Sequence, residues 1–109
     1  MAGKFVLKIS RGGKFRFNLR AGNGQVILTS EAYKTKKSAL NGTVSVGKNC
    51  NNEKCIDRKV AKNGKPYFNL KSTNGQVIGK SQMYASNASM EKGIRSVQKN
   101  GGSPVDDQT

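Results

Sequence analysis

The sequence is an internal duplication, and this feature limits the folds open to it more than any other. Residues 13–49 and 64–100 align without a gap after a shift of 51 positions, and 18 of the 37 aligned residues are identical. A repeated unit of about 50 residues is too small to bury its apolar face alone, so neighbouring copies share a core. We therefore predict a single pseudo-twofold domain over residues 1–109, with repeat one at 4–50 and repeat two at 55–107.

Each repeat begins with a pattern typical of three antiparallel strands. Apolar and polar residues alternate over 5–9, 15–19 and 25–29, and again over 56–60, 67–71 and 76–80. Gly12-Gly13 and Asn63-Gly64 separate the first two strands of each repeat and predict tight two-residue hairpin turns. Asn23-Gly24 and Asn74-Gly75 mark the turns that precede the third strands.

The pattern then changes to that of a helix. Thr35 and Ser86 are good N-cap residues, and small or apolar residues follow each of them at spacings of three and four. These residues are Ala39, Gly42, Thr43 and Val46 in repeat one, and Met90, Gly93, Ile94 and Val97 in repeat two. A glycine inside a helix costs about 1 kcal/mol relative to alanine. Its presence in both copies predicts a close approach of each helix to the sheet or to the other helix.

The segments after the helices are less regular. Residues 50–55 form a polar connection, and an extended span from Glu53 could close repeat one and open repeat two. The tail GGSPVDDQT, taken alone, is typical of a frayed end. The predicted fold class is α+β, with one mainly antiparallel sheet and both helices on one of its faces.

The segments FRFNLRAGNGQVILTSEAY, YFNLKSTNGQVIGKSQMYA and GIRSVQKNG resemble the YegP-like family of small bacterial proteins. The repeat of that family is known as a domain of unknown function, and the resemblance covers essentially the whole chain. It implies two β-β-β-α-β repeats in one sheet, with their last strands exchanged between the repeats. Residues near 53–59 and 105–107 would then be strands. The resemblance implies no activity and no catalytic residues.

Charge is the main functional clue. The chain has 20 Lys and Arg residues against 6 Asp and Glu, a net charge of +14. Side chains alternate between the two faces of a strand, and a basic, polar set is predicted on the face away from the helices. This set consists of Lys8, Lys14, Arg16, Asn18, Arg20, Lys59, Lys65, Tyr67, Asn69 and Lys71. Such a surface would attract phosphates and release counterions, and asparagines could contact bases or sugars.

Two functions stay open at this point. Edge strands and exchanged strands favour an interaction module for a protein partner or for self-association. The basic set favours binding of nucleic acid or another polyanion, although only Tyr67 offers an aromatic ring there, and single-strand binders usually stack bases on several. The same set also fits a solvated sheet face without a ligand. The tandem form predicts a monomer, since the second repeat replaces a second subunit.

Enzymatic chemistry is disfavoured. The chain has no His, the usual general acid–base near neutral pH, and its acidic residues do not recur between the repeats. Cys50 and Cys55 cannot fill a four-ligand zinc site, so no metal or cofactor is predicted. No apolar stretch approaches the roughly 20 residues of a membrane span, and no export signal is seen. We expect a cytoplasmic protein with both thiols reduced.

Overall fold

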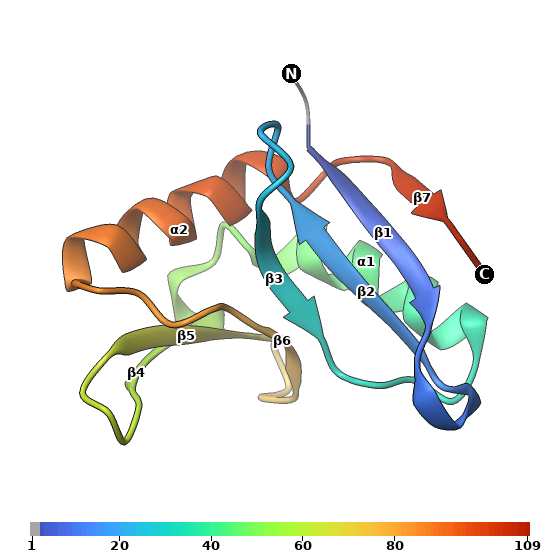
Figure 1. Cartoon of the computed structure of the whole chain (residues 1–109), viewed down its shortest axis with the longest axis horizontal. Coiled ribbons are helices and arrows are strands. Elements are labelled where there is room, and N and C mark those ends of the chain that lie inside the picture. The colour runs from blue at the N-terminus through green and yellow to red at the C-terminus, as the bar shows by residue number, and fades with distance from the viewer. Residues whose placement is uncertain (1–2) are drawn as a thin grey trace.

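A computed structural model describes residues 3–109 of the chain. The strands are β1 (Lys4–Ile9), β2 (Phe15–Arg20), β3 (Val26–Ser30), β4 (Ile56–Val60), β5 (Pro66–Lys71), β6 (Val77–Lys80) and β7 (Val105–Asp107). The helices are α1 (Lys36–Asn49) and α2 (Asn87–Asn100). The strands form one mixed sheet in the order β4-β5-β6-β3-β2-β1-β7, with both helices against one face (Figure 1). The predicted α+β fold is confirmed.

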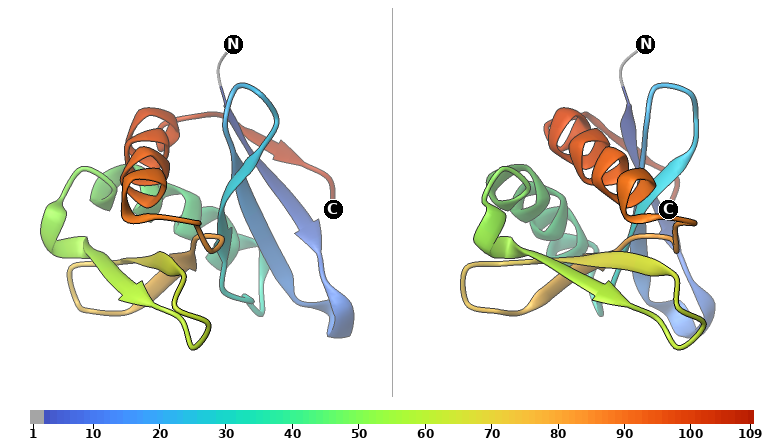
Figure 2. Two further views of the ribbon diagram at one scale, coloured as in Figure 1. Left: turned by 60° about the vertical axis from the view of Figure 1, so that its left-hand side comes forward. Right: turned by 90° about the vertical axis from the view of Figure 1, so that its left-hand side faces the viewer.

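The two repeats meet at the centre of the sheet. β3 and β6 pair antiparallel through Thr29 with Lys80 and Ser30 with Gly79. The sheet twists strongly on either side of this junction, and the two helices lie in the angle between its halves (Figure 2). Each helix contacts strands of both repeats, and one buried hydrophobic cluster includes residues from both.

The first hairpin of each repeat is one residue longer than predicted. The loops contain residues 11–13 and 62–64, and each is closed by a backbone hydrogen bond. Ser10 N–H donates to Lys14 O (2.6 Å), and Ala61 N–H donates to Lys65 O (2.9 Å). The last loop residue is glycine, with φ +75° in the first loop and +82° in the second. A left-handed residue there restores the twist of the strands, which explains the longer loop.

The helices begin and pack as predicted. Thr35 Oγ1 accepts a hydrogen bond from Ser38 N–H (3.1 Å), and Ser86 Oγ accepts one from Ser89 N–H (3.2 Å). The predicted apolar stripe is buried in both helices.

The helical glycines make room for the tyrosine that precedes each helix. A Cβ at Gly42 would come within 2.6 Å of the Tyr33 hydroxyl and 2.8 Å of the Phe17 ring, and a Cβ at Gly93 would overlap Tyr84. Tyr33 stacks on Phe17 with ring centroids 6.2 Å apart, and Tyr84 makes the same contact with Phe68 in repeat two. The predicted approach of helix to sheet is therefore mediated by a tyrosine.

The last strand of each repeat pairs with the other repeat, as the resemblance implied. β4 follows α1 and pairs antiparallel with β5, where it also serves as the first strand of repeat two. β7 follows α2 and pairs parallel with β1. A short 3-10 helix, η2 (Glu53–Cys55), precedes β4 in place of a separate closing strand. β1 is consequently covered on its outer side by β7, whereas β4 is the last strand at its end of the sheet.

The C-terminal tail is ordered rather than frayed, so the expectation from the tail residues alone is wrong. Phe5 N–H donates to Pro104 O (2.9 Å), and Gln108 N–H donates to Leu7 O (2.8 Å). Lys4 Nζ lies 3.3 Å from Asp106 Oδ2. The tail is therefore held by backbone pairing and by charge. Among residues 3–109, neither helix has the length and hydropathy to cross a membrane.

Candidate polyanion-binding face

The sheet face turned away from the helices carries the residues predicted from the charge pattern, and we call it the basic face. The register places one cross-strand row along its middle. In sheet order the row is Asp57, Asn69, Lys80, Thr29, Asn18, Val6 and Asp106. Lys8 lies opposite Arg16, and Lys59 lies opposite Tyr67. Lys14 and Lys65 lie beside the hairpin loops, at the ends of this face.

The repeat-two half of the basic face is partly neutralised by an acid. Asp57 Oδ2 lies 3.0 Å from Lys71 Nζ and 3.4 Å from Lys59 Nζ. The hydrogen bond from Lys71, with a further one from Lys59, holds the pKa of Asp57 below its ordinary value. Lys59 and Lys71 are therefore less available to an external anion than the sequence suggested. The strand alternation could have placed Asp57 on this face, since it lies two residues from Lys59.

The repeat-one half keeps more of its cations, although Asp106 of β7 lies in the same row and pairs with Lys4. Val6 occupies the position equivalent to Asp57, and its side chain is buried. Among residues 3–109, no ion pair joins Lys8, Arg16 or Lys80 to an acid. Arg20 lies opposite Lys4, and its Nε is buried without a hydrogen-bond partner in this part of the chain. The strongest unneutralised charge on the basic face thus lies over β1, β2 and the centre.

Lys80 is the main residue that sequence analysis missed. It pairs with Asn69 on β5 and with Thr29 on β3, which places it beside the junction of the repeats. Its ammonium group lies 4.8 Å from the centroid of the Tyr67 ring, a cation–π contact. The pairing of β3 with β6 brings Lys80 to the centre, and nothing within a single repeat signals that pairing.

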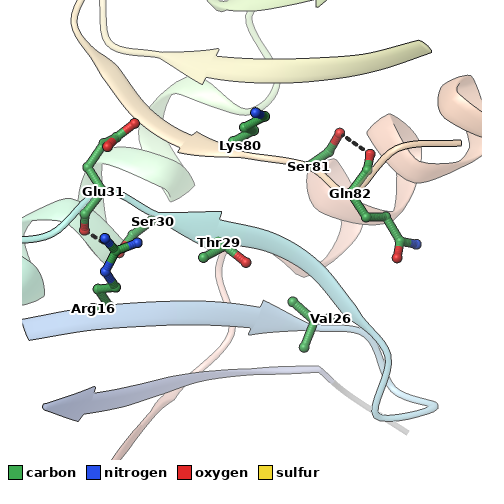
Figure 3. Close-up of a pocket in the computed structure, with 8 residues that line it drawn as sticks. All are labelled: Arg16, Val26, Thr29, Ser30, Glu31, Lys80, Ser81 and Gln82. Atoms are coloured by element: carbon green, nitrogen blue, oxygen red, sulfur yellow. Dashed lines mark hydrogen bonds between the residues drawn. The ribbon is translucent and has the colours of Figure 1, made fainter. Parts of the chain in front are cut away.

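A shallow hollow of about 280 Å³ marks the junction of the repeats (Figure 3). Arg16, Glu31, Lys80 and Gln82 contribute to its polar lining. The hydroxyls of Ser30 and Ser81 are occupied, because each accepts a hydrogen bond from a backbone N–H of β2 or β5 and donates to a nearby carbonyl. Small-molecule pockets are usually about 300–1,000 Å³. The hollow therefore suits part of an extended ligand better than a whole enclosed one.

The acidic residues gather at the two ends of the sheet. Arg58 of β4 is clamped by Glu91 Oε2 of α2 (2.6 Å) and Glu53 Oε2 of η2 (2.9 Å). At the opposite end, Asp106 pairs with Lys4 and Asp107 with Lys36. With Asp57 on β4, these are all the acids of the chain except Glu31. Glu31 lines the central hollow, where it lies with the two cations Arg16 and Lys80, so the middle of the sheet keeps an excess of positive charge.

The same ion pairs lower the pKa values of the carboxylates. Hydrogen bonds from Arg58 keep the pKa of Glu53 and of Glu91 below the ordinary range. A hydrogen bond from Lys36 lowers the pKa of Asp107 to about 2. A general acid near neutral pH needs a raised pKa, so these carboxylates are poorly suited to that role.

Within residues 3–109, no three acidic or cysteine side chains come together as a metal site would require. Cys50 and Cys55 are free and buried, and burial raises the pKa of Cys50. A thiol in that state is a weak nucleophile.

Comparison with known proteins gives a consistent family. A domain of unknown function, DUF1508, matches twice, at residues 10–57 and 61–107. The chain is 54% identical over 101 residues to the UPF0339 protein YegP of Escherichia coli K12, covering 93% of this chain and 92% of that one. It is 55% identical over 101 residues to a UPF0339 protein of Acinetobacter baylyi, covering 93% and 91%.

Two solved structures have the same fold. The solution NMR structure of E. coli YegP, described as a protein of unknown function, matches with a TM-score of 0.94 and 53% identity, over 100% of this chain and 95% of that one. A UPF0339 protein of Shewanella oneidensis matches with a TM-score of 0.92 and 50% identity, over 98% and 92%.

Proposed function

This chain belongs to the DUF1508 family, and we propose that it is a non-enzymatic protein that binds nucleic acid through its basic face. One observation carries the proposal. Lys8, Arg16 and Lys80 lie on the sheet face that the helices leave open, and none of them forms an ion pair within residues 3–109. Five of the six acids are paired toward the ends of the sheet, and Glu31 is the one acid that lines the central hollow with Arg16 and Lys80. A cationic centre between neutralised edges directs a polyanion across the strands.

The geometry favours contacts to phosphates over contacts to bases. Tyr67 is the aromatic residue of the basic face, and its ring already carries the ammonium group of Lys80. Stacking of bases on several rings is therefore not expected, and phosphate contacts carry no sequence information directly. We expect binding with little preference for base sequence.

The absence of catalysis and the cytoplasmic location belong to the same proposal. The sequence has no His, and the acids with shifted pKa values are shifted downward, toward permanent ionisation. Two buried free thiols suit a reducing compartment such as the cytoplasm.

The test is fluorescence anisotropy with a labelled 20-nucleotide single-stranded RNA and a matched DNA duplex, at 50 and 200 mM salt. For about three phosphate contacts on a single strand, the affinity should fall roughly 15- to 20-fold across this salt change. Binding that is absent at 50 mM salt, or unchanged by salt, would contradict the proposal.

A matched pair of variants separates the basic face from the bulk charge. Arg16→Glu/Lys80→Glu changes two cations on the basic face, and Lys37→Glu/Lys92→Glu changes two exposed cations on the helices. The first variant should lower the affinity at 50 mM salt at least tenfold more than the second. Equal losses would show that net charge, and not this face, accounts for binding.

A further inference from the structure

The register of β4 with β5 shows which backbone groups of β4 point away from the sheet. The hydrogen bond from Ala61 to Lys65 closes the hairpin, so every second residue before Ala61 bonds toward β5. Asp57 and Lys59 therefore face β5 with their backbone groups, while Arg58 and Val60 present theirs to the outside. Figure 2 shows β4 at the margin of the sheet, and no strand of residues 3–109 lies beyond it.

The other end of the sheet is protected. The backbone groups of Phe5 and Leu7, which correspond to those of Ile56 and Arg58, are bonded to the segment around β7. β7 itself is only three residues long and carries two acids, and short, charged edge strands resist further pairing. The five-residue β4 is the longer exposed edge of the two.

A strand cannot pair with β4 in the parallel manner in which β7 pairs with β1. A strand added parallel to β4, as β7 is added to β1, would need the Ile56 N–H as a donor. That N–H already bonds to Glu53 O within η2. Within residues 3–109, the backbone groups of β4 without a partner are the Arg58 N–H and C=O, the Val60 N–H and C=O, and the Ile56 C=O. All of these except the Val60 C=O find a partner in an antiparallel strand centred on Arg58.

We propose that β4 pairs antiparallel with β4 of a second copy of this chain, about a twofold axis at Arg58. The two Arg58 residues then exchange a pair of hydrogen bonds, and each Val60 N–H donates to Ile56 O of the second copy. Asp57 faces Lys59 of the second copy on the basic face, and the reverse pair forms by symmetry. The strand is thus complementary in charge to itself when inverted, as an isologous interface requires.

The surroundings of β4 remove the main obstacles to this pairing. Arg58 would face its own copy, but each Arg58 is clamped by Glu53 and Glu91, so the local charge is not repulsive. The side chain of Val60 is 69% exposed, and on the helix-facing side it would pack beside Ile56 of the second copy. A large exposed apolar side chain on an edge strand gains from such cover.

The association should be weak and should strengthen with salt. Pairing over five residues buries far less than the roughly 1,600 Å² of a standard interface. Two molecules of charge +14 also repel each other, and salt screens that repulsion. This salt dependence is opposite to that expected for nucleic-acid binding, so the two proposals succeed or fail separately.

The direct test is NMR on the full chain from 20 µM to 1 mM, at 50 and 500 mM NaCl. Concentration-dependent shifts should be confined to Ile56–Val60 and adjacent residues, and should be larger at high salt. In a sample mixed from differently labelled chains, an intermolecular Hα–Hα contact should join Asp57 to Lys59. Monomer at 1 mM in 500 mM NaCl, or shifts centred on another surface, would overturn the proposal.

Variants with exchanged charges, measured by sedimentation velocity, test the proposed register between the two copies of β4. Asp57→Lys and Lys59→Asp should each weaken the dimer at least tenfold, because each places like charges opposite one another. The double variant Asp57→Lys/Lys59→Asp should restore it. Lys8→Asp is the matched control, since Lys8 is the repeat-one counterpart of Lys59 beside a covered edge, and it should leave the dimer intact. A double variant that fails to dimerise although its amide spectrum is native-like would overturn the proposed register.

Discussion

In repeat one the outer strand β1 is flanked by β7, whereas in repeat two no strand within residues 3–109 flanks the outer side of the equivalent strand β4. The cores of the two repeats nevertheless match closely. Phe17, Tyr33 and Gly42 make the contacts that Phe68, Tyr84 and Gly93 make. Duplication has therefore preserved the packing between tyrosine, sheet and helix while the sheet edges diverged.

The divergence also reaches the basic face. Val6 in repeat one corresponds to Asp57 in repeat two, where the acid neutralises two lysines. In repeat one the acid on this face is Asp106 of β7, and it pairs with Lys4 instead. The comparison indicates that shared residues specify the fold, while differing residues specify what each half can contact.

The largest expected effect is a loss of stability when the glycine–tyrosine contact found in both repeats is altered. Gly42→Ala and Gly93→Ala should each destabilise the fold by about 1–3 kcal/mol, because the added methyl group overpacks against a tyrosine. At Gly42 the added methyl also meets the buried ring of Phe17, whereas at Gly93 it meets Tyr84 alone but at closer range. Urea unfolding followed by circular dichroism measures both.

The control for this pair is Gly102→Ala, where a Cβ meets no atom within 4 Å. It should change stability by less than about 0.5 kcal/mol. Adding Tyr84→Leu, which removes both the hydroxyl and the ring carbon that the new methyl meets, should recover more stability in the Gly93→Ala background than Tyr33→Leu does in the Gly42→Ala background, where Phe17 still clashes. Equal recovery in the two repeats would contradict the difference we draw between them.

A smaller loss of stability is expected when β7, which covers the outer edge of β1, is removed. Removal of residues 103–109 deletes the parallel ladder between β7 and β1, together with the bonds from Phe5 to Pro104 and from Gln108 to Leu7. At about 1 kcal/mol for each hydrogen bond, the two bonds outside the ladder alone should lower the free energy of unfolding by about 2 kcal/mol. Both sheet edges are then exposed, so sedimentation at high salt should detect species larger than dimers. Unchanged stability would show that β7 adds little to the fold.

The smallest effect is local and depends on pH. Asp107 has a pKa of about 2, against an ordinary 3.8, because Lys36 donates a hydrogen bond to it. A depressed carboxylate pKa stabilises the folded state above the ordinary pKa, and that contribution is lost as pH falls through the depressed value. The tail should therefore loosen between about pH 4 and pH 2.

Amide NMR across this range checks that expectation. The Gln108 amide should shift and exchange faster with solvent as the pH falls, while the Phe17 amide, which donates to Ser30 Oγ inside the sheet, should respond less. Simultaneous loss of both signals would indicate global unfolding and would contradict a local release of β7.

Much of the fold could be predicted from local patterns. The alternation of apolar and polar residues predicted the first three strands of each repeat. The N-cap residues and the apolar residues at helical spacing predicted both helices. The length of the loops could not be predicted, because Gly-Gly and Asn-Gly are compatible with both two- and three-residue turns. The tail residues alone did not predict β7, because this strand is held by partners that are distant in the sequence, such as Phe5 and Lys4.

The candidate site, like the fold, could be predicted only as far as local patterns allow. Strand alternation assigned residues such as Arg16 and Asn69 to the face where the structure places them. The neutralisation of Lys59 and Lys71 by Asp57, and the central place of Lys80, depend on which strands lie side by side. That information resides in long-range pairing rather than in either repeat.

The parallel pairing of β7 with β1 has a consequence for how the chain matures. Phe5 and Val105 are partners in that pairing, yet they lie 100 positions apart in the sequence. During synthesis the outer edge of β1 therefore stays unpaired until the residues of β7 have also been made. This stage, with a strand edge exposed, is a natural point for chaperone protection.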